Sequence, residues 1–225
     1  MSFRDYNYIF VVTYARSGST LIQSLLNSLD GVQIRGENNN ALFYLYQAFS
    51  GVKMTAKLGR WGRESEPDQP WYGAGEMKPI GFQNASLNAL VRNVLCPTDG
   101  ISVLGFKEIR YTPFFMTDKQ FKDYMDFLLG AFPGAKIVFN TRKADDVAKS
   151  AWLAKEKPGK VKDWVNRCDE RFAQCNASSD QTILMHYNDY VVDRSKIAEL
   201  YTFLGFDFDL DVVNAIFSKP LKHAK

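Results

Sequence analysis

The sequence predicts an α/β fold of three layers, in which a central, mainly parallel sheet of about five strands lies between two sets of helices. Short runs of β-branched and aromatic residues alternate with longer stretches that have apolar residues at helical spacing. The short runs are apolar at almost every position, which is typical of strands buried on both faces. Strands that alternate with helices form right-handed βαβ units and therefore a parallel sheet. The length of 225 residues suits a single domain over residues 1–225.

The elements follow in order along the chain. Tyr8–Tyr14 is the first expected strand, and Thr20–Leu29 is the helix that follows it, ended by Gly31. Further strands are expected at Val32–Arg35, Ile101–Phe106, Lys136–Asn140 and Thr182–His186. Further helices are expected at Lys119–Ala131, Asp145–Ala154, Lys162–Cys175, Ser195–Leu204 and Asp209–Phe217.

Residues 51–81 interrupt this alternation. Glycines, prolines and mixed charges predict a long loop or insertion there. Its aromatic side chains Trp61, Trp71 and Tyr72 either contact an acceptor molecule or anchor the loop to the core.

The composition excludes several classes of protein. Hydrophobic residues make up 46% of the chain, which excludes disorder, and the net charge of +3 argues against a nucleic-acid partner. No apolar run approaches the length of a membrane helix, so a cytoplasmic protein with no transmembrane segment is expected. Three cysteines and two histidines give neither a disulfide framework nor a metal site, and the cysteines are expected to be idle thiols: Cys96, Cys168 and Cys175.

The stretch Thr13–Leu26, with the sequence TYARSGSTLIQSLL, predicts an anion site. A buried strand enters a tight loop at Gly18 and passes straight into a helix, so backbone N–H groups and the positive helix end converge. Arg16 adds a positive charge, and hydroxyl donors come from Ser17, Ser19 and Thr20. The alternative is a serine-capped helix with an incidental arginine. A nucleoside-triphosphate loop would have glycine at position 13 and lysine at position 19, where this chain has Thr13 and Ser19.

A second constellation follows the strand Lys136–Asn140. Arg142 leaves the carboxyl end of that strand, where ligands bind in open α/β sheets. Ser150 is expected two turns into the next helix, so that its hydroxyl converges with Arg142 on a second phosphate. A local ion pair of Arg142 with Asp145 or Asp146 is the alternative.

These two motifs resemble those of the sulfotransferase family. The YARSGST loop resembles the family's 5′-phosphosulfate loop, and Arg142 with Ser150, seven residues between them, resembles its 3′-phosphate motif. The resemblance implies a P-loop-type α/β fold and 3′-phosphoadenylyl sulfate (PAPS) as the sulfuryl donor, without a metal. Ala15 stands where many members have proline, Arg16 replaces a commoner lysine, and the late glycine-rich basic segment is missing. The chain is therefore more similar to bacterial and carbohydrate-type members, which implies a carbohydrate or related small-metabolite acceptor.

The resemblance also implies catalytic roles. Arg16 corresponds to the loop cation that contacts the bridging oxygen, and Glu37 stands where several members carry the general base. Lys107 and Glu108 end the central strand, where Lys107 would stabilise the sulfonate. An internal ion pair of Glu108 with Lys107 or Arg110 is the alternative, and Glu108 is the reserve candidate for the base.

Two other functions fit the same loop. A P-loop kinase or other nucleotide phosphotransferase would need magnesium, and the missing lysine argues against it. A non-catalytic nucleotide-binding protein would bind the bisphosphate without turnover. The basic residues after Ser150 are expected to form a solvated face or mobile loop: Lys155, Lys157, Lys160 and Lys162.

Overall fold

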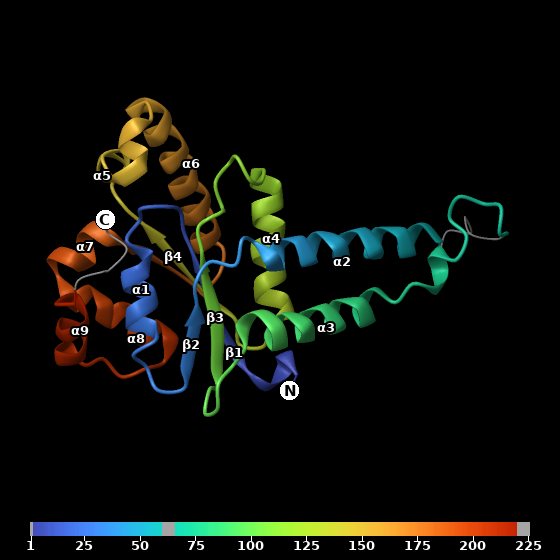
Figure 1. Ribbon diagram of the computed structural model, residues 1–225, viewed down its shortest axis with the longest axis horizontal. Coiled ribbons are helices and arrows are strands. Elements are labelled where there is room, and N and C mark those ends of the chain that lie inside the picture. The colour runs from blue at the N-terminus through green and yellow to red at the C-terminus, as the bar shows by residue number, and fades with distance from the viewer. Residues whose placement is uncertain (1, 60–65, 220–225) are drawn as a thin grey trace. The chain divides into compact units, whose positions relative to one another are not determined.

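The computed structural model describes residues 2–59 and 66–219 of the chain (Figure 1). The chain divides into two compact units. The sheet unit consists of Tyr6–Asn39 and Pro97–Lys225, and the helical unit consists of Met1–Asp5 and Asn40–Cys96.

The sheet unit contains the predicted parallel sheet. Its strands are ordered β2-β3-β1-β4-β5, and all four neighbouring pairs are parallel. Because all strands run the same way, the loops that leave their carboxyl ends gather at one edge. The fold-class prediction is confirmed. The strands are β1 (Asn7–Val12), β2 (Val32–Arg35), β3 (Val103–Glu108), β4 (Lys136–Thr141) and β5 (Thr182–His186).

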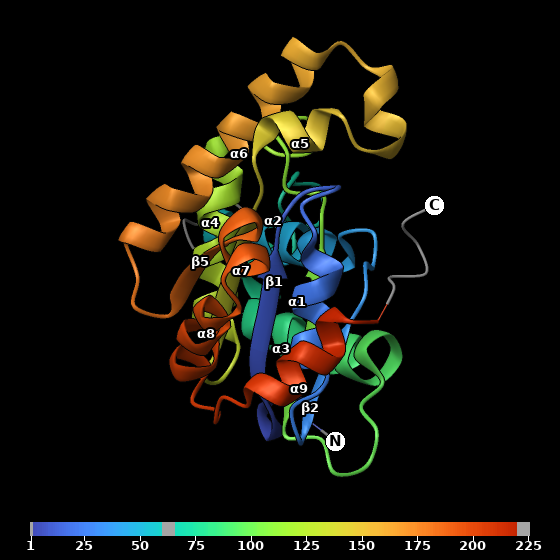
Figure 2. The same cartoon turned by 90° about the vertical axis from the view of Figure 1, so that its left-hand side faces the viewer.

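Helices cover both faces of this sheet. One layer consists of α1 (Ser19–Leu26), α8 (Ile197–Leu204) and α9 (Leu210–Phe217), which share a buried apolar cluster with β1 and β2. Figure 2 views the sheet from the side of this layer. The other layer consists of α4 (Asp118–Ala131) and α6 (Pro158–Ala177). Phe139 of β4 there stacks on Phe172 of α6, with ring centroids 5.1 Å apart.

Two predictions about helices on this side are wrong in detail. The helix expected at Asp145–Ala154 is divided into α5 (Ala144–Ala148) and a 3₁₀ helix, η5 (Ala151–Lys155). Ser150 between them is extended, and Ala151 has a φ of 49°, which no α-helical residue adopts. The helix expected at Lys162–Cys175 begins earlier, because Pro158 takes a first-turn position that needs no N–H donor.

Short elements complete the sheet unit. The helix α7 (Tyr187–Val192) directly follows β5, and the sequence did not predict it. A 3₁₀ helix, η6 (Arg194–Lys196), lies between α7 and α8.

The helical unit is built around α2 (Ala41–Leu58) and α3 (Pro79–Leu90), which lie side by side (Figure 1). Its shorter elements are η1 (Phe3–Asp5), η3 (Ala74–Glu76) and the π-helical η4 (Val91–Leu95). The Phe3 N–H donates to Asn88 Oδ1 of α3 at 2.8 Å. In the described part of the chain, no helix is both long and apolar enough to cross a membrane.

The prediction of a loop over residues 51–81 is wrong at both ends, where the structure has helices. The helix α2 continues through Gly51 to Leu58, so its packing against α3 outweighs the cost of about 1 kcal/mol that a glycine adds inside a helix. Pro79 begins α3 in the position that proline favours. Trp71 and Tyr72 are exposed, so burial in a core does not anchor them, and Trp61 lies outside the described residues.

Candidate active site at the carboxyl edge of the sheet

The loop between β1 and α1 has the backbone conformation of a tight anion-binding turn. Arg16 and Gly18 both have positive φ, at 66° and 83°. A Cβ added to Gly18 would lie 2.1 Å from a ring carbon of Tyr187, at the start of α7. Only glycine satisfies both the positive φ and this close contact. The next residue, Ser19, begins α1, and no side chain caps this helix start among the described residues.

Buried hydrogen bonds hold this loop against β4. The Thr13 hydroxyl lies 2.7 Å from the Ser17 hydroxyl and donates to the Asn140 carbonyl oxygen, also at 2.7 Å. The Asn140 amide donates to the Ser17 carbonyl oxygen at 3.0 Å and accepts from the Tyr190 hydroxyl at 2.9 Å. Thr13 and Ser17 are fully buried, so their hydroxyls fix the loop and do not face a ligand.

Tyr14 connects the same loop to Arg142 and to α6. Its hydroxyl accepts from the Arg142 N–H at 2.9 Å and lies 2.9 Å from Asp169 Oδ1. Burial raises the pKa of Asp169 to about 6, against the lowering effect of the Tyr14 hydrogen bond. Burial also raises the pKa of Tyr14, and the Asp169 charge adds to this. Tyr14 therefore remains a neutral donor at physiological pH.

A cavity of about 330 Å³ opens beside this loop. Its charged lining is mostly basic, with three cations (Arg16, Lys107 and Arg142) and the carboxylate of Glu37. The other lining residues are Ala15, Gly18, Ser19, Thr20, Ile109, Trp152 and Tyr187. A concave site with this charge and a helix N-terminus at its wall suits an anion.

The two predicted phosphate motifs meet at Arg16. The Arg16 Nε donates to the Ser150 hydroxyl at 2.9 Å, and Arg142 Nη1 donates to the Arg16 carbonyl oxygen at 3.1 Å. Ser150 reaches this contact from the break between α5 and η5, so the expectation that it lies within a helix is wrong. Its hydroxyl contacts Arg16 and does not line the cavity.

Arg142 retains unused hydrogen-bonding capacity. Its Nε is buried and has no hydrogen-bond partner among residues 2–59 and 66–219. Its guanidinium lies over the Tyr187 ring, 4.6 Å from the centroid, which fixes its orientation by a cation–π contact. Buried polar atoms in native proteins are normally paired, so an oriented cation with an unused donor fits an anionic group.

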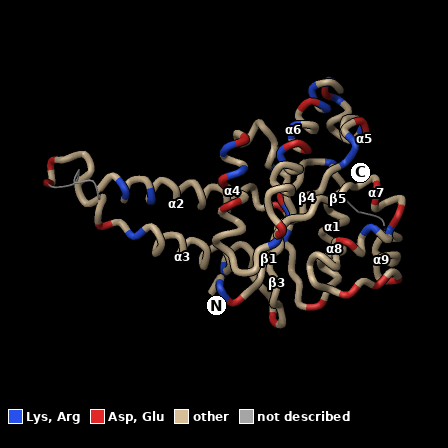
Figure 3. Tube along the Cα trace, turned by 180° about the vertical axis from the view of Figure 1, so that it is seen from behind, with Lys and Arg blue, Asp and Glu red and all other residues tan. Residues whose placement is uncertain are grey.

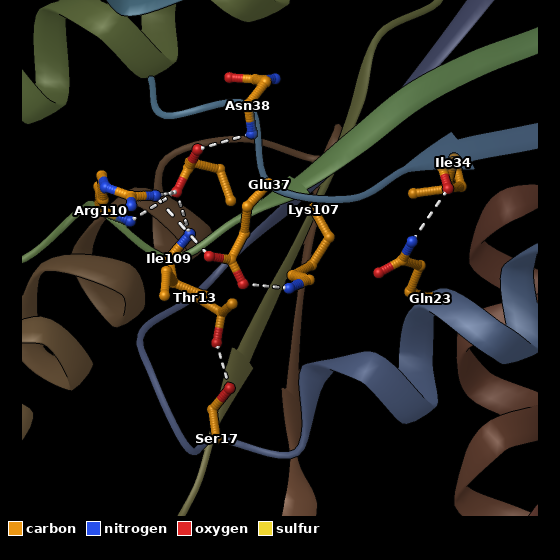
Figure 4. A network of polar contacts seen from close by, with 10 residues as sticks. Thr13, Ser17, Gln23, Ile34, Glu37, Asn38, Lys107, Ile109 and Arg110 are labelled. Atoms are coloured by element: carbon orange, nitrogen blue, oxygen red, sulfur yellow. Dashed lines mark hydrogen bonds and ion pairs between the residues drawn. The ribbon is translucent and has the colours of Figure 1, made fainter. Parts of the chain in front are cut away.

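Glu37, which follows β2, and Glu108, which ends β3, have different environments (Figure 4). Glu37 accepts from Lys107 Nζ at 2.6 Å, lies 3.7 Å from Arg110 Nη1 and lines the cavity. Glu108 is fully buried and accepts from Arg110 Nη1 at 3.1 Å. It also accepts from the backbone N–H groups of Asn38, Ile109 and Arg110. The internal ion pair that the sequence offered as an alternative is present for Glu108.

The structure therefore brings most of the predicted site residues to one cavity. Seven of them line it: Arg16, Gly18, Ser19, Thr20, Glu37, Lys107 and Arg142. The other three do not line it but form hydrogen bonds with nearby residues: Ser17 with Thr13, Glu108 with Asn38 and Ser150 with Arg16. Sequence reasoning missed Tyr187 and Trp152. Tyr187 could have been found as an aromatic residue directly after the last predicted strand, whereas no feature of the sequence marks Trp152.

Other candidate groups are not part of this cavity. No cluster of three or more His, Cys, Asp or Glu that could hold a metal occurs in the described residues. The cysteines are free thiols, and burial raises the pKa of Cys168 to about 12. The basic residues from Lys155 to Lys162 are mixed with acidic ones (Figure 3), and Lys162 pairs with Asp145. The Asp145 pair is thus made by Lys162 and not by Arg142.

The similarity to solved structures extends over most of the chain. The sulfotransferase domain from the curacin biosynthetic pathway aligns with 96% of this chain and 80% of its own, at 12% identity and a TM-score of 0.48. The sulfotransferase from Alicyclobacillus acidocaldarius aligns over 97% and 87%, at 16% identity and a TM-score of 0.47. Retinol dehydratase, in complex with androsterone and the inactive cofactor PAP, aligns over 93% and 63%, at 15% identity and a TM-score of 0.42.

Sequence comparison gives the family. No protein with a curated description matches the sequence. The family model described as the sulfotransferase family matches residues 8–210, which is most of the chain and includes the β1–α1 loop, β3 and Arg142. The chain belongs to the sulfotransferase family.

Proposed function

We propose that the protein transfers the sulfuryl group of PAPS to a hydroxyl of a carbohydrate or related small-metabolite acceptor. The observation that carries this proposal is the convergence of Arg16, Lys107 and Arg142 on one cavity beside the Gly18 turn. Transfer between two oxygen atoms with charge spread over a sulfonate depends chiefly on positioning and on fixed positive charge, by analogy with phosphoryl transfer.

The residues of the cavity fit the donor. Arg16, Ser19, Thr20 and the first N–H groups of α1 would hold the 5′-phosphosulfate, and Arg142 would hold the 3′-phosphate with its unused Nε donor. When bound, PAPS supplies the activated sulfuryl group and leaves as adenosine 3′,5′-bisphosphate. Ser150 contributes through Arg16, because its hydroxyl accepts from the Arg16 Nε and so fixes the direction of that guanidinium.

Glu37 is the group best placed to take the proton of the acceptor hydroxyl. Its carboxylate lines the cavity and is about one-third exposed, so a hydroxyl can reach it. Lys107 holds Glu37 in position and at the same time adds positive charge beside the sulfonate. Glu108 is fully buried and engaged by three backbone N–H groups and Arg110, so its role is to position the strand end.

The test is calorimetric binding of adenosine 3′,5′-bisphosphate and of 5′-AMP. We expect the bisphosphate to bind at least tenfold more tightly, which corresponds to about 1.4 kcal/mol or more. Arg142→Ala should remove most of this preference, because it deletes the cation proposed for the 3′-phosphate. Arg167→Ala on the exposed side of α6 is the matched control and should leave both affinities unchanged.

The results separate the alternatives. Equal affinity of the wild-type protein for the two nucleotides would contradict the donor assignment. Binding of the bisphosphate without transfer to any acceptor from labelled PAPS would favour the non-catalytic alternative. Magnesium-dependent transfer of phosphate from a nucleoside triphosphate would favour the phosphotransferase.

A further inference from the structure

A second cavity adjoins the proposed donor cavity within the sheet unit. Its volume is about 470 Å³, and it shares Ala15, Ile109 and Trp152 with the donor cavity. Most of its wall is apolar and comes from two segments, the loop after β3 and the η5–α6 region. The apolar side chains are Phe114, Phe115, Trp152, Leu153, Val161 and Trp164.

The aromatic wall is unusually open to solvent. Phe114 is 66% exposed, Phe115 is 55% exposed and Trp152 is 59% exposed. Leu153, Val161 and Trp164 are buried and form the floor of the cavity behind them. Exposed large apolar side chains around a cavity with a buried apolar base are typical of a binding site for an apolar ligand.

The polar side chains that line this cavity are Arg110, Thr112, Glu156 and Lys160, and the Thr112 hydroxyl is buried without a hydrogen-bond partner in the described residues. Arg110 bonds to the buried Glu108 at 3.1 Å and lies 3.7 Å from Glu37. Glu156 and Lys160 are exposed side chains of the same wall. A sugar ring carries hydroxyls around its circumference, and each would need a partner when water is displaced. This wall offers an apolar ring many contacts and a polyhydroxylated ring few partners.

We propose that this second cavity binds the body of the acceptor, and that the acceptor is a hydroxylated molecule with an apolar aromatic or alicyclic ring system. This inference rests on the proposed function and narrows its acceptor to the apolar small metabolites. Ala15, Ile109 and Trp152 line both cavities, and Glu37 lines the donor cavity. An acceptor whose ring lies beside Phe114, Phe115 and Trp152 would therefore extend its hydroxyl into the cavity that contains Glu37.

The test is binding of two hydroxylated probes to the protein, measured by calorimetry with and without adenosine 3′,5′-bisphosphate. The probes are 2-naphthol, which is apolar and aromatic, and N-acetylglucosamine, which is polar. We expect wild-type protein to bind 2-naphthol at least tenfold more tightly than N-acetylglucosamine. Phe114→Ala should weaken 2-naphthol binding about tenfold, the order of effect that apolar pocket contacts give. The bisphosphate affinity should not change, because Phe114 lines the second cavity and not the donor cavity.

Two further variants keep the result interpretable. Phe115→Ala should also weaken 2-naphthol binding, and it replaces Phe114→Ala if that variant proves hard to purify. Val192→Ala is the control, since Val192 is apolar and 88% exposed but lies outside both cavities. Tighter binding of the sugar, or unchanged 2-naphthol affinity in both phenylalanine variants, would overturn the inference. If the bisphosphate does not bind, the proposed function is contradicted. The inference about the second cavity is then still decided by the affinity of 2-naphthol for the protein without bisphosphate.

Discussion

The hydrogen bond between Tyr14 and Asp169 predicts an unusual pH dependence of stability, which Asp169→Asn should remove. The Asp169 carboxyl is partly buried and accepts from a tyrosine hydroxyl at 2.9 Å. Burial raises its pKa from 3.8 to about 6. The asparagine keeps an oxygen that can accept the same hydrogen bond, so the substitution removes the ionisation and preserves the contact.

The sign and size of the effect follow from linkage. Because the pKa in the folded protein is higher than in the unfolded chain, the contribution of Asp169 to stability is fully present below pH 3.8 and is lost as the pH rises through about 6. The difference between these two values corresponds to about 3 kcal/mol as an upper limit. The carboxyl is only partly buried, and screening by solvent reduces this loss to about 1–2 kcal/mol. An asparagine side chain does not ionise, so the Asp169→Asn variant should not lose this contribution.

Urea unfolding of both proteins from pH 4 to pH 8 measures this difference. We expect similar free energies of unfolding at pH 4 and an advantage of about 1–2 kcal/mol for Asp169→Asn at pH 8. The bisphosphate affinity at pH 8 should stay within about threefold, since Tyr14 still accepts from the Arg142 N–H. A variant that is less stable than wild type at pH 8, or a gap that does not change with pH, would refute the reasoning.

Three other predictions concern the active site itself. Glu37→Gln should reduce turnover by about 10²–10⁴ and leave donor affinity nearly unchanged, as steady-state kinetics would show. The isosteric comparison is Glu108→Gln. If Glu108→Gln loses turnover while Glu37→Gln keeps it, the general base is Glu108 on β3. Gly18→Ala should lower the free energy of unfolding by about 2–4 kcal/mol through its positive φ and its clash with Tyr187, and a cost below about 0.5 kcal/mol in urea unfolding would contradict that geometry. Transfer should persist in EDTA, and activity that disappears in EDTA and returns with magnesium would support a phosphotransferase.

The sheet and the β1–α1 loop were predictable because both depend on local patterns. A strand buried on both faces is mostly apolar, and β1 and β4 are buried from their second residues onward, although β4 ends on the buried polar residues Asn140 and Thr141. The turn at Gly18 likewise needs glycine for its φ of 83°. Parallel topology then places the strand ends at one edge, so Arg16, Lys107 and Arg142 come together although they are distant in sequence.

The errors arose where tertiary contacts decide the local structure. Gly51 and Pro79 are both common in loops, but each occupies a helical position that tolerates it in α2 and α3. The position of Ser150 depends on the left-handed Ala151 and on the contact with Arg16, and neither is visible in the local sequence. The aromatic cavity combines residues from the loop after β3 with residues of η5 and α6, so no single segment of the sequence marks it.

Glu37, which the sequence analysis gives as the base, and Glu108, its reserve candidate, differ in burial. Both lie at the carboxyl edge of the sheet, and both are within reach of Arg110. The oxygens of Glu108 accept hydrogen bonds from Asn38, which directly follows Glu37, and from Ile109 and Arg110, which directly follow β3. It therefore fixes the backbone that carries Glu37 and the cation beside it. Glu108→Gln replaces one acceptor oxygen of a fully buried group by an amide and so costs stability. Glu37→Gln also removes the charge that pairs with Lys107, but it keeps an oxygen that can accept from Lys107 Nζ, so we expect its larger effect on the reaction. Glu108→Gln should therefore be detected first in unfolding measurements, and Glu37→Gln first in turnover.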